Sequence, residues 1–272
     1  MPTGTDADLE DLLTSGVLTP VGRIVDSSNG ALLCSVEGAL DPAEGATPVL
    51  VIHKPEASER PLWDYPDGTL VARERAAYLV SAAGAFDVVP PTVLRNGPLG
   101  PGSVQLWVGP LEGEPRPLVD VTPAHEVPDG WVVVLEGESP GGRPVVVSHS
   151  TEPALRTVAV FDAVLNNSDR KGGHLLRDAD LVRGCDHGVS LGVEPKLRTV
   201  LWGWAGEPVP DPDLARLETL LDALGDGLAD ELETLLTRAE VRALRHRTQS
   251  LLRSRRHPAP RPGWPAIPWP AM

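Results

Sequence analysis

The sequence predicts an α+β fold with two lobes, a small antiparallel sheet with one helix followed by a mainly helical part. Apolar runs separated by a turn signal between residues 22 and 54 predict the sheet. Apolar residues at helical spacing in 69–84, and leucines at helical spacing through 212–256, predict the helices. The length of 272 residues suits one domain divided into two lobes better than two large independent cores.

The first lobe is expected to span residues 1–109. After a short helix at 6–14, the segment 22–36 predicts a hairpin, because Asn-Gly near its tip is a strong hairpin turn signal. An apolar strand ends at Lys54, and the helix that follows has Thr69 as its candidate N-cap and Gly84 at its end. Further strands are expected at 87–89, 92–94 and 103–108, with a turn at 96–102.

The second lobe is expected to span residues 110–257. An irregular segment (110–130) comes first, and then a hairpin around ESPGG at 138–142. The segment 152–167 predicts a helix, because Pro153 suits a first turn and apolar residues fill one face. Two short strands, HLLR and LVRGCDHG, follow around Asp178-Ala179-Asp180, and the rest is helical.

The tail, residues 258–272, is too rich in proline to form a helix or a central strand. Exposed tryptophans would make a poor surface, so we expect Trp264, Ile267 and Trp269 to dock on the body of the protein. Recognition by a groove of a partner is the alternative.

Composition excludes several classes of partner. A net charge of -14 disfavours nucleic acid and anionic membranes. No run of about 18 apolar residues is present, so no membrane span is expected, and the polar, acidic first residues differ from a signal peptide. Cys34 and Cys185 are far apart and lack zinc-site spacing, which favours a cytoplasmic protein.

Two neighbouring segments carry the strongest chemical signal. LNNSDRKGGHLL (165–176) is the end of a helix and a polar loop, and GCDHGVSL (184–191) ends a hairpin in Asp-x-Gly. Phosphoryl transfer needs one carboxylate to orient the attacking hydroxyl and another to hold a metal ion beside the phosphates. Asp169 and Asp186, separated by 17 positions (186 minus 169), are the candidates.

This order of motifs resembles the phosphoinositide 3- and 4-kinase superfamily and the HipA-type bacterial kinases. Their loop has the pattern DRHxxN, where this chain has Asp169-Arg170-Lys171-Gly172-Gly173-His174. Within the superfamily, the chain is most similar to actinobacterial phosphatidylinositol-kinase-like proteins. The resemblance extends over roughly residues 20–205 and implies a bilobal atypical protein-kinase-like (PI3/4-kinase-like) fold.

The resemblance also implies roles for individual residues. Lys54 would reach the ATP phosphates, with Glu74 as its ion-pair partner, and the hairpin loop with Ser27, Ser28 and Asn29 would cover them. The strand with Gln105, Leu106, Trp107 and Val108 would present its backbone to adenine. Asp169 would orient the acceptor hydroxyl, Lys171 would neutralise charge, and Asp186 would bind Mg²⁺ or Mn²⁺, together with His174.

The chain departs from the family pattern at two of these positions. His174 replaces the asparagine that holds a second metal, and Mg²⁺ prefers oxygen ligands, so His174 could favour Mn²⁺, bond phosphate or mark weak activity. Lys171 replaces a histidine and could be a solvated loop residue. Simple structural roles also remain open for Lys54, Glu74, Asp169 and Asp186, and a core role for His187.

The expected function is therefore ATP-dependent transfer of the γ-phosphate to a hydroxyl of a protein serine or threonine or of a small polyol. The alternative is a nucleotide-binding pseudokinase that acts as a scaffold or regulator, and a third hypothesis is a protein that binds no nucleotide. Ser148 and His149 do not predict a hydrolase, because no Gly-x-Ser-x-Gly is present. The arginines of 244–257 predict a solvated helix end or a site for an acidic partner.

Overall fold

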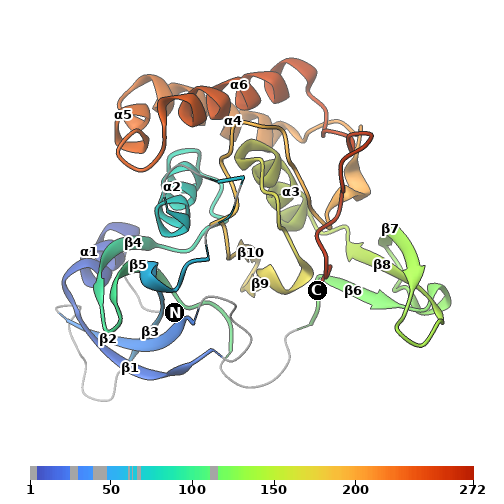
Figure 1. Ribbon diagram of the computed structural model, residues 1–272. Coiled ribbons are helices and arrows are strands. Elements are labelled where there is room, and N and C mark those ends of the chain that lie inside the picture. Colours follow the sequence, from blue (N-terminus) through green and yellow to red (C-terminus); the bar gives the residue numbers. More distant parts are fainter. Residues whose placement is uncertain are drawn as a thin grey trace.

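A computed structural model describes residues 5–24, 30–38, 48–60, 62, 64–65, 69–110 and 116–272. Over these residues the chain has a mixed α+β fold, with antiparallel sheets and six α-helices (Figure 1). The predicted fold class is confirmed at this level. The predicted phosphate-covering residues Ser27, Ser28 and Asn29 lie outside the described residues.

A five-stranded antiparallel sheet forms most of the first hundred residues, in the order β1-β2-β3-β5-β4. One face packs against helix α1 (Asp6–Ser15), whose Leu13 is fully buried with Val51 and Val104 of the sheet. Burial alternates along β3, so Val51 and His53 lie inside while Ile52 and Lys54 are partly exposed. The strands are β1 (Val17–Arg23), β2 (Leu32–Glu37), β3 (Val49–Pro55), β4 (Thr92–Gly97) and β5 (Gly100–Leu106).

Helix α2 (Leu70–Ala83) begins and ends where the sequence predicts. The Thr69 hydroxyl accepts a hydrogen bond from the Ala72 amide, and Gly84 is the C-cap. The Glu59 carboxylate accepts from the amides of Leu70 and Val71, which the helix itself leaves unpaired. In Figure 1, α2 lies between the five-stranded sheet and helices α5 and α6.

Residues 116–254 form a second set of elements around a large apolar core. Helix α3 (Pro153–Leu165) has Pro153 at its first position, as predicted, and nine of its residues are buried. A three-stranded antiparallel sheet in the order β6-β8-β7 and a two-stranded β9–β10 hairpin flank it. The remaining elements are β6 (Val119–Thr122), β7 (Trp131–Glu138), β8 (Pro144–Ser150), β9 (Leu175–Asp178), β10 (Leu181–Gly184), α4 (Asp211–Gly225), α5 (Leu228–Leu232) and α6 (Arg238–Ser254).

Three details differ from the sequence prediction. Residues 87–89 are not a strand, because the amides of Val88 and Val89 donate to the Ser81 hydroxyl of α2 instead of to a neighbouring strand. The turn predicted at 96–102 is confined to Pro98 and Leu99, since β4 and β5 pair up to Gly97 and Gly100. Finally, β6 occupies part of the segment that was expected to be irregular.

The proline-rich tail docks on the body, as predicted for Trp264 and Ile267. The Arg198 guanidinium stacks on the Trp264 ring, and Ile267 packs against the large core. Trp269 is the exception, because 85% of its surface is exposed. The Ala271 carbonyl accepts from the Gly172 amide, so the tail reaches the loop that holds Asp169.

Candidate functional site

The two predicted carboxylates lie on segments that leave regular structure at well-defined points. Helix α3 ends at Asn166, which has a left-handed backbone with φ 56°, and the chain then turns into the loop with Asp169. Asp186 follows strand β10 and also has a positive φ of 60°. A left-handed conformation is uncommon outside glycine, and aspartate is one of the few other residues that adopt it.

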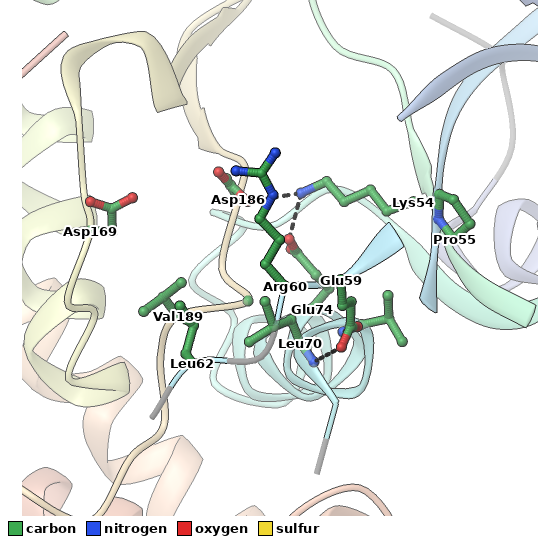
Figure 2. A pocket seen from close by; sticks show the side chains of 12 residues that line it. Lys54, Pro55, Glu59, Arg60, Leu62, Leu70, Glu74, Asp169, Asp186 and Val189 are labelled. Carbon is green, nitrogen blue, oxygen red and sulfur yellow. Dashed lines mark hydrogen bonds and ion pairs between the residues drawn. The ribbon is translucent and has the colours of Figure 1, made fainter. Parts of the chain in front are cut away.

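A cavity of about 170 Å³ brings Asp169 and Asp186 together with Lys54 and Glu74. Figure 2 shows these side chains, which come from β3, from α2 and from the two segments just described. The volume is below the roughly 300–1,000 Å³ of pockets that enclose a whole small molecule. The other lining residues are Pro55, Glu59, Arg60, Leu62, Leu70, Val71, Gly188 and Val189.

Lys54 is the centre of the charge arrangement. Its Nζ lies 2.5 Å from Glu74 Oε1 and 3.1 Å from Asp186 Oδ1. Burial alone would lower the pKa of Lys54, but the carboxylates of Asp186 and Glu74 outweigh that effect and raise it. The Lys54 ammonium in turn holds the pKa of Asp186 well below its usual value. Both groups are therefore charged at neutral pH.

Asp169 is in a different electrostatic environment from Asp186. Burial raises the pKa of Asp169, and the nearby Lys171, whose Nζ lies 3.2 Å from Asp169 Oδ2, opposes that rise. A carboxylate with a raised pKa is a better proton acceptor than an ordinary one. The raised pKa of Asp169 suits a proton acceptor, and the lowered pKa of Asp186 suits a ligand of a cation.

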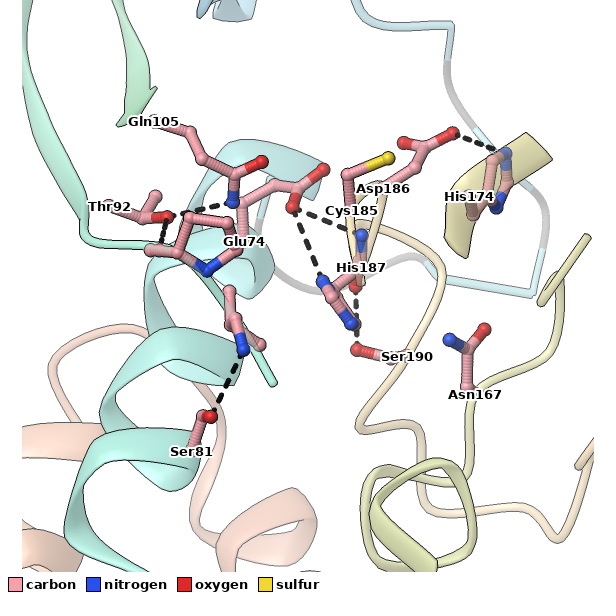
Figure 3. A network of polar contacts seen from close by, with 12 residues as sticks. Glu74, Ser81, Thr92, Gln105, Asn167, His174, Cys185, Asp186, His187 and Ser190 are labelled. Carbon is pink, nitrogen blue, oxygen red and sulfur yellow. Dashed lines mark hydrogen bonds and ion pairs between the residues drawn. The ribbon is translucent and has the colours of Figure 1, made fainter. Parts of the chain in front are cut away.

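His174 lies next to Asp186, with 3.4 Å between Nε2 and Asp186 Oδ2 (Figure 3). Burial lowers the pKa of His174 to about 4, so its imidazole is neutral at pH 7, and its Nδ1 has no hydrogen-bond partner in the described part of the chain. A neutral imidazole beside a carboxylate fits a divalent cation. Within the described ranges no group of three or more His, Cys, Asp and Glu side chains is arranged to hold a metal, so such an ion would take further ligands from phosphate and water.

A buried ionic network beneath this site holds the Asp169 loop in place. Arg170 and Asp162 have fully buried side chains, with 3.0 Å between Arg170 Nη2 and Asp162 Oδ1. Asp162 also accepts hydrogen bonds from Asn167 and Thr199. The loop with Asn167 and Arg170 and the later segment with Thr199 are therefore tied to one carboxylate of α3.

Arg170 also connects the loop to Glu74. Its Nη2 lies 2.7 Å from His187 Nε2, and its Nη1 donates to the Cys185 carbonyl. The His187 amide donates to Glu74 Oε2, as Figure 3 shows. Burial lowers the pKa of His187, so the ring is neutral and can accept from the guanidinium. His187 is thus the core residue that one of the sequence-based alternatives foresaw.

The predicted adenine-contacting residues are not in the Lys54 cavity. Gln105 is buried and donates from Nε2 to the Thr92 hydroxyl, and the amides of Leu106 and Trp107 already donate to the carbonyls of Pro91 and Leu50. Leu106 and Val108 line a separate cavity of about 480 Å³ beside the β9–β10 hairpin. The assignment of Gln105–Val108 to adenine remains a prediction.

Sequence reasoning missed two residues of this region, Arg60 and Asp162. Arg60 lines the cavity beside Lys54, but it lies in a segment without a regular pattern. Asp162 could not be identified because it lies among apolar residues of a helix, and only its partners from two other segments explain its burial.

Ser148 and His149 do not form a hydrolase site. The Nδ1 of His149 lies 2.7 Å from the Ser150 carbonyl oxygen, and its Nε2 accepts from the Gly203 amide. Both ring nitrogens are therefore bonded to the backbone, and none is left to activate a serine.

Comparison with known proteins places the chain within a family. No family model matches the sequence. The chain is 46% identical over 273 residues to "Protein Rv2133c" of Mycobacterium tuberculosis, and the match covers 97% of this chain and 96% of that protein. The chain belongs to the family of Rv2133c. Because nearly all of both chains is matched, the family likeness includes the sheet with Lys54 as well as the segments with Asp169 and Asp186.

Among the helices that the structure describes in this chain, none is long and apolar enough to cross a membrane.

Proposed function

We propose that the chain is an atypical kinase that transfers the γ-phosphate of ATP to a hydroxyl group. The observation that supports the proposal most strongly is that Lys54, Glu74, Asp169 and Asp186 line the same cavity. A lysine paired with a helix glutamate, an Asp-x-Gly aspartate beside it and a second aspartate across the cavity are the protein groups that phosphoryl transfer uses. Residues 1–109 and 110–257 would act as the two lobes, with 258–272 as a docked tail.

Lys54 and Arg60 are suited to hold the phosphate groups of ATP. Both cations line the cavity, and Glu74 and Asp186 fix the position of the Lys54 ammonium. The cavity volume of about 170 Å³ suits the phosphate end of a nucleotide. The adenine would then lie outside this cavity, near residues 105–108.

Asp186 and His174 are the residues that would hold Mg²⁺ or Mn²⁺. Their facing oxygen and nitrogen are 3.4 Å apart, and both carry the protonation state that ligation requires. The ion would supply positive charge that neutralises the phosphates of ATP.

Asp169 would orient the acceptor hydroxyl and take its proton as the new bond to phosphorus forms and the bond between the γ-phosphorus and the bridging oxygen of ADP breaks. Burial raises the pKa of Asp169, which suits this role. Lys171, beside Asp169, would neutralise charge on the transferred group. A protein serine or threonine and a small polyol both provide such a hydroxyl, and an ATP-dependent role fits a cytoplasmic protein.

A pseudokinase that binds nucleotide and serves as a scaffold or regulator is the second candidate. One observation favours it, namely that a neutral, partly buried His174 stands where the resembling kinases have a metal-binding asparagine. Such a protein would bind ATP through Lys54 and Asp186 without using Asp169.

Phosphotransfer from γ-labelled ATP, with Mg²⁺ and then with Mn²⁺, tests the proposal. We expect label on the protein or on an added acceptor. Asp169→Asn should reduce transfer about a hundredfold or more, because it removes the base. Asp186→Asn should reduce both transfer and nucleotide binding, while Asp129→Asn, an exposed position remote from the cavity lining, should change neither.

The same variants separate the two candidates. Nucleotide binding that Asp186→Asn weakens, with no transfer by the wild type in either metal, would favour the pseudokinase. Absence of ATP binding in both metals would contradict both proposals.

A further inference from the structure

A second cavity, of about 350 Å³, lies between helix α6, the end of α3 and the segment after α6. Its lining includes Arg247, Arg256 and Arg261 together with Trp202 and Leu251. It shares no lining residue with the cavity of Lys54, and its volume is within the range of small-molecule sites. The arginine-rich stretch that the sequence singled out at 244–257 thus contributes to a cavity as well as to a helix end.

The three guanidinium groups are held by neutral partners. Arg247 donates to the carbonyls of Val164 and Gly192, Arg256 to that of Gly206, and Arg261 to that of Pro195. Among the described residues none of the three has a carboxylate oxygen within 4.0 Å. In a chain with a net charge of -14, three arginines line one cavity without an ion pair among the described residues, and the carboxylate that acts on Arg247, that of Glu240, is already paired with Arg73.

Arg247 has hydrogen-bonding capacity that the protein does not use. Its Nη2 is buried and has no hydrogen-bond partner among the residues that the structure describes. A buried donor without an acceptor is destabilising, and more so when it is charged. Burial also lowers the pKa of Arg247 to about 10, which leaves the group charged at neutral pH. An anion in the cavity would supply negative charge beside the three arginines that line it.

The rest of the lining is suited to an apolar group. Trp202 points its indole Nε1 at the Ala266 carbonyl, so the ring needs no polar partner from a ligand, and Leu197 and Leu251 add aliphatic surface. We propose that this cavity binds a small organic anion, with a phosphate or carboxylate held by Arg247, Arg256 and Arg261 and an apolar part against Trp202. Arginine forks recognise both kinds of anion.

Calorimetric titration with phenyl phosphate, benzoate and the neutral benzyl alcohol tests the proposal. The first two distinguish phosphate from carboxylate, and the third shows whether charge is required. We expect the wild type to bind at least one of the two anions and to bind benzyl alcohol more weakly. The double variant Arg256→Gln/Arg261→Gln should bind that anion about tenfold more weakly or worse. It is preferred to an Arg247 variant, because Arg247 also holds two backbone carbonyls.

Two control variants locate the binding. Arg242→Gln removes an exposed arginine of α6 that does not line the cavity and should leave the affinity unchanged. Lys54→Met should also leave it unchanged, because Lys54 belongs to the other cavity. Failure of both anions to bind at millimolar concentration, equal affinity in the double variant, or loss of binding only in Lys54→Met would overturn the proposal.

Discussion

A buried carboxylate at position 162 accepts hydrogen bonds from Arg170, Asn167 and Thr199, and no part of its side chain is exposed. Arg170 is equally buried, and its guanidinium also forms hydrogen bonds to His187 Nε2 and to the Cys185 carbonyl. Taking two charges out of water is costly, and this pair is tolerable because hydrogen bonds satisfy both groups. The loop with Asp169 and the segment with Asp186 therefore share one anchor.

Asp162→Asn should destabilise the protein by about 3–5 kcal/mol, because it leaves the Arg170 charge buried without a counter-charge. Urea unfolding gives this difference directly. Asp211→Asn is the matched control, since the ion pair between Asp211 and Arg255 is exposed and its loss should matter little. Equal effects of the two substitutions would contradict the anchoring role of Asp162.

Individual site residues differ in how visible they are in the sequence. Lys54 and Asp186 could be identified because each ends a local pattern, an apolar strand in one case and an Asp-x-Gly after a hairpin in the other. The sequence also suggested Glu74 as the partner of Lys54, and the structure joins them. Arg60 and Asp162 have no local pattern, because their positions follow from contacts between distant segments.

At the scale of elements, helices α2 and α6 are joined by a buried ion pair. Arg73 Nη2 lies 2.6 Å from Glu240 Oε1, and both side chains are almost fully buried. The other oxygen of Glu240 accepts from the Thr237 amide and hydroxyl and completes the capping box of α6. Glu240 therefore caps the N-terminus of α6 and also binds Arg73 of α2, the helix that carries Glu74.

Comparing Thr237→Ala with Glu240→Gln separates these two roles of Glu240. Thr237→Ala removes the cap and should cost about 1 kcal/mol. Glu240→Gln also removes the counter-charge of Arg73 and should cost about 3 kcal/mol or more, because one partner of a buried pair is lost. The free energies of unfolding in urea measure both effects, and similar values for the two variants would mean that the ion pair adds nothing.

Elements were predictable where the local pattern and the final contacts agree. Helix α2 has its cap, its apolar spacing and its terminal glycine in sequence, and it forms as expected. Strand β6 has only four residues and depends on pairing with β8, so its own sequence gives little signal. Residues 87–89 are apolar enough for a strand, but two of their amides donate hydrogen bonds to the Ser81 hydroxyl instead of to a neighbouring strand.

At the scale of the whole molecule, buried histidines make stability depend on pH. Burial lowers the pKa of His174 and of His257 to about 4, and it also lowers the pKa of His53, His149 and His187. Burial disfavours protonation of these rings in the folded protein, whereas in the unfolded chain each titrates near the ordinary histidine pKa of about 6.5. Between these values the unfolded chain binds more protons than the folded protein does.

Stability should therefore be full above about pH 6.5 and should fall as the pH drops from there toward 4. His174 and His257, whose pKa falls to about 4, each contribute a loss of about 1 kcal/mol per pH unit in this window. Carboxylates with a lowered pKa, such as Asp186, lose their contribution only at lower pH, below the ordinary aspartate value of 3.8. Urea unfolding at several pH values between 7.5 and 4.5 measures the slope.

His257→Gln should reduce this slope by the contribution of one proton, because it removes one buried group that titrates in the unfolded chain. His125→Gln should leave the slope unchanged, since 81% of the His125 side chain is exposed. A stability that stays constant between pH 6.5 and 4.5 would contradict the role of the buried rings. A slope that His257→Gln leaves intact would assign the acid sensitivity to the remaining histidines. Of these, His174 lies beside Asp186, so the acid sensitivity would then involve the candidate site.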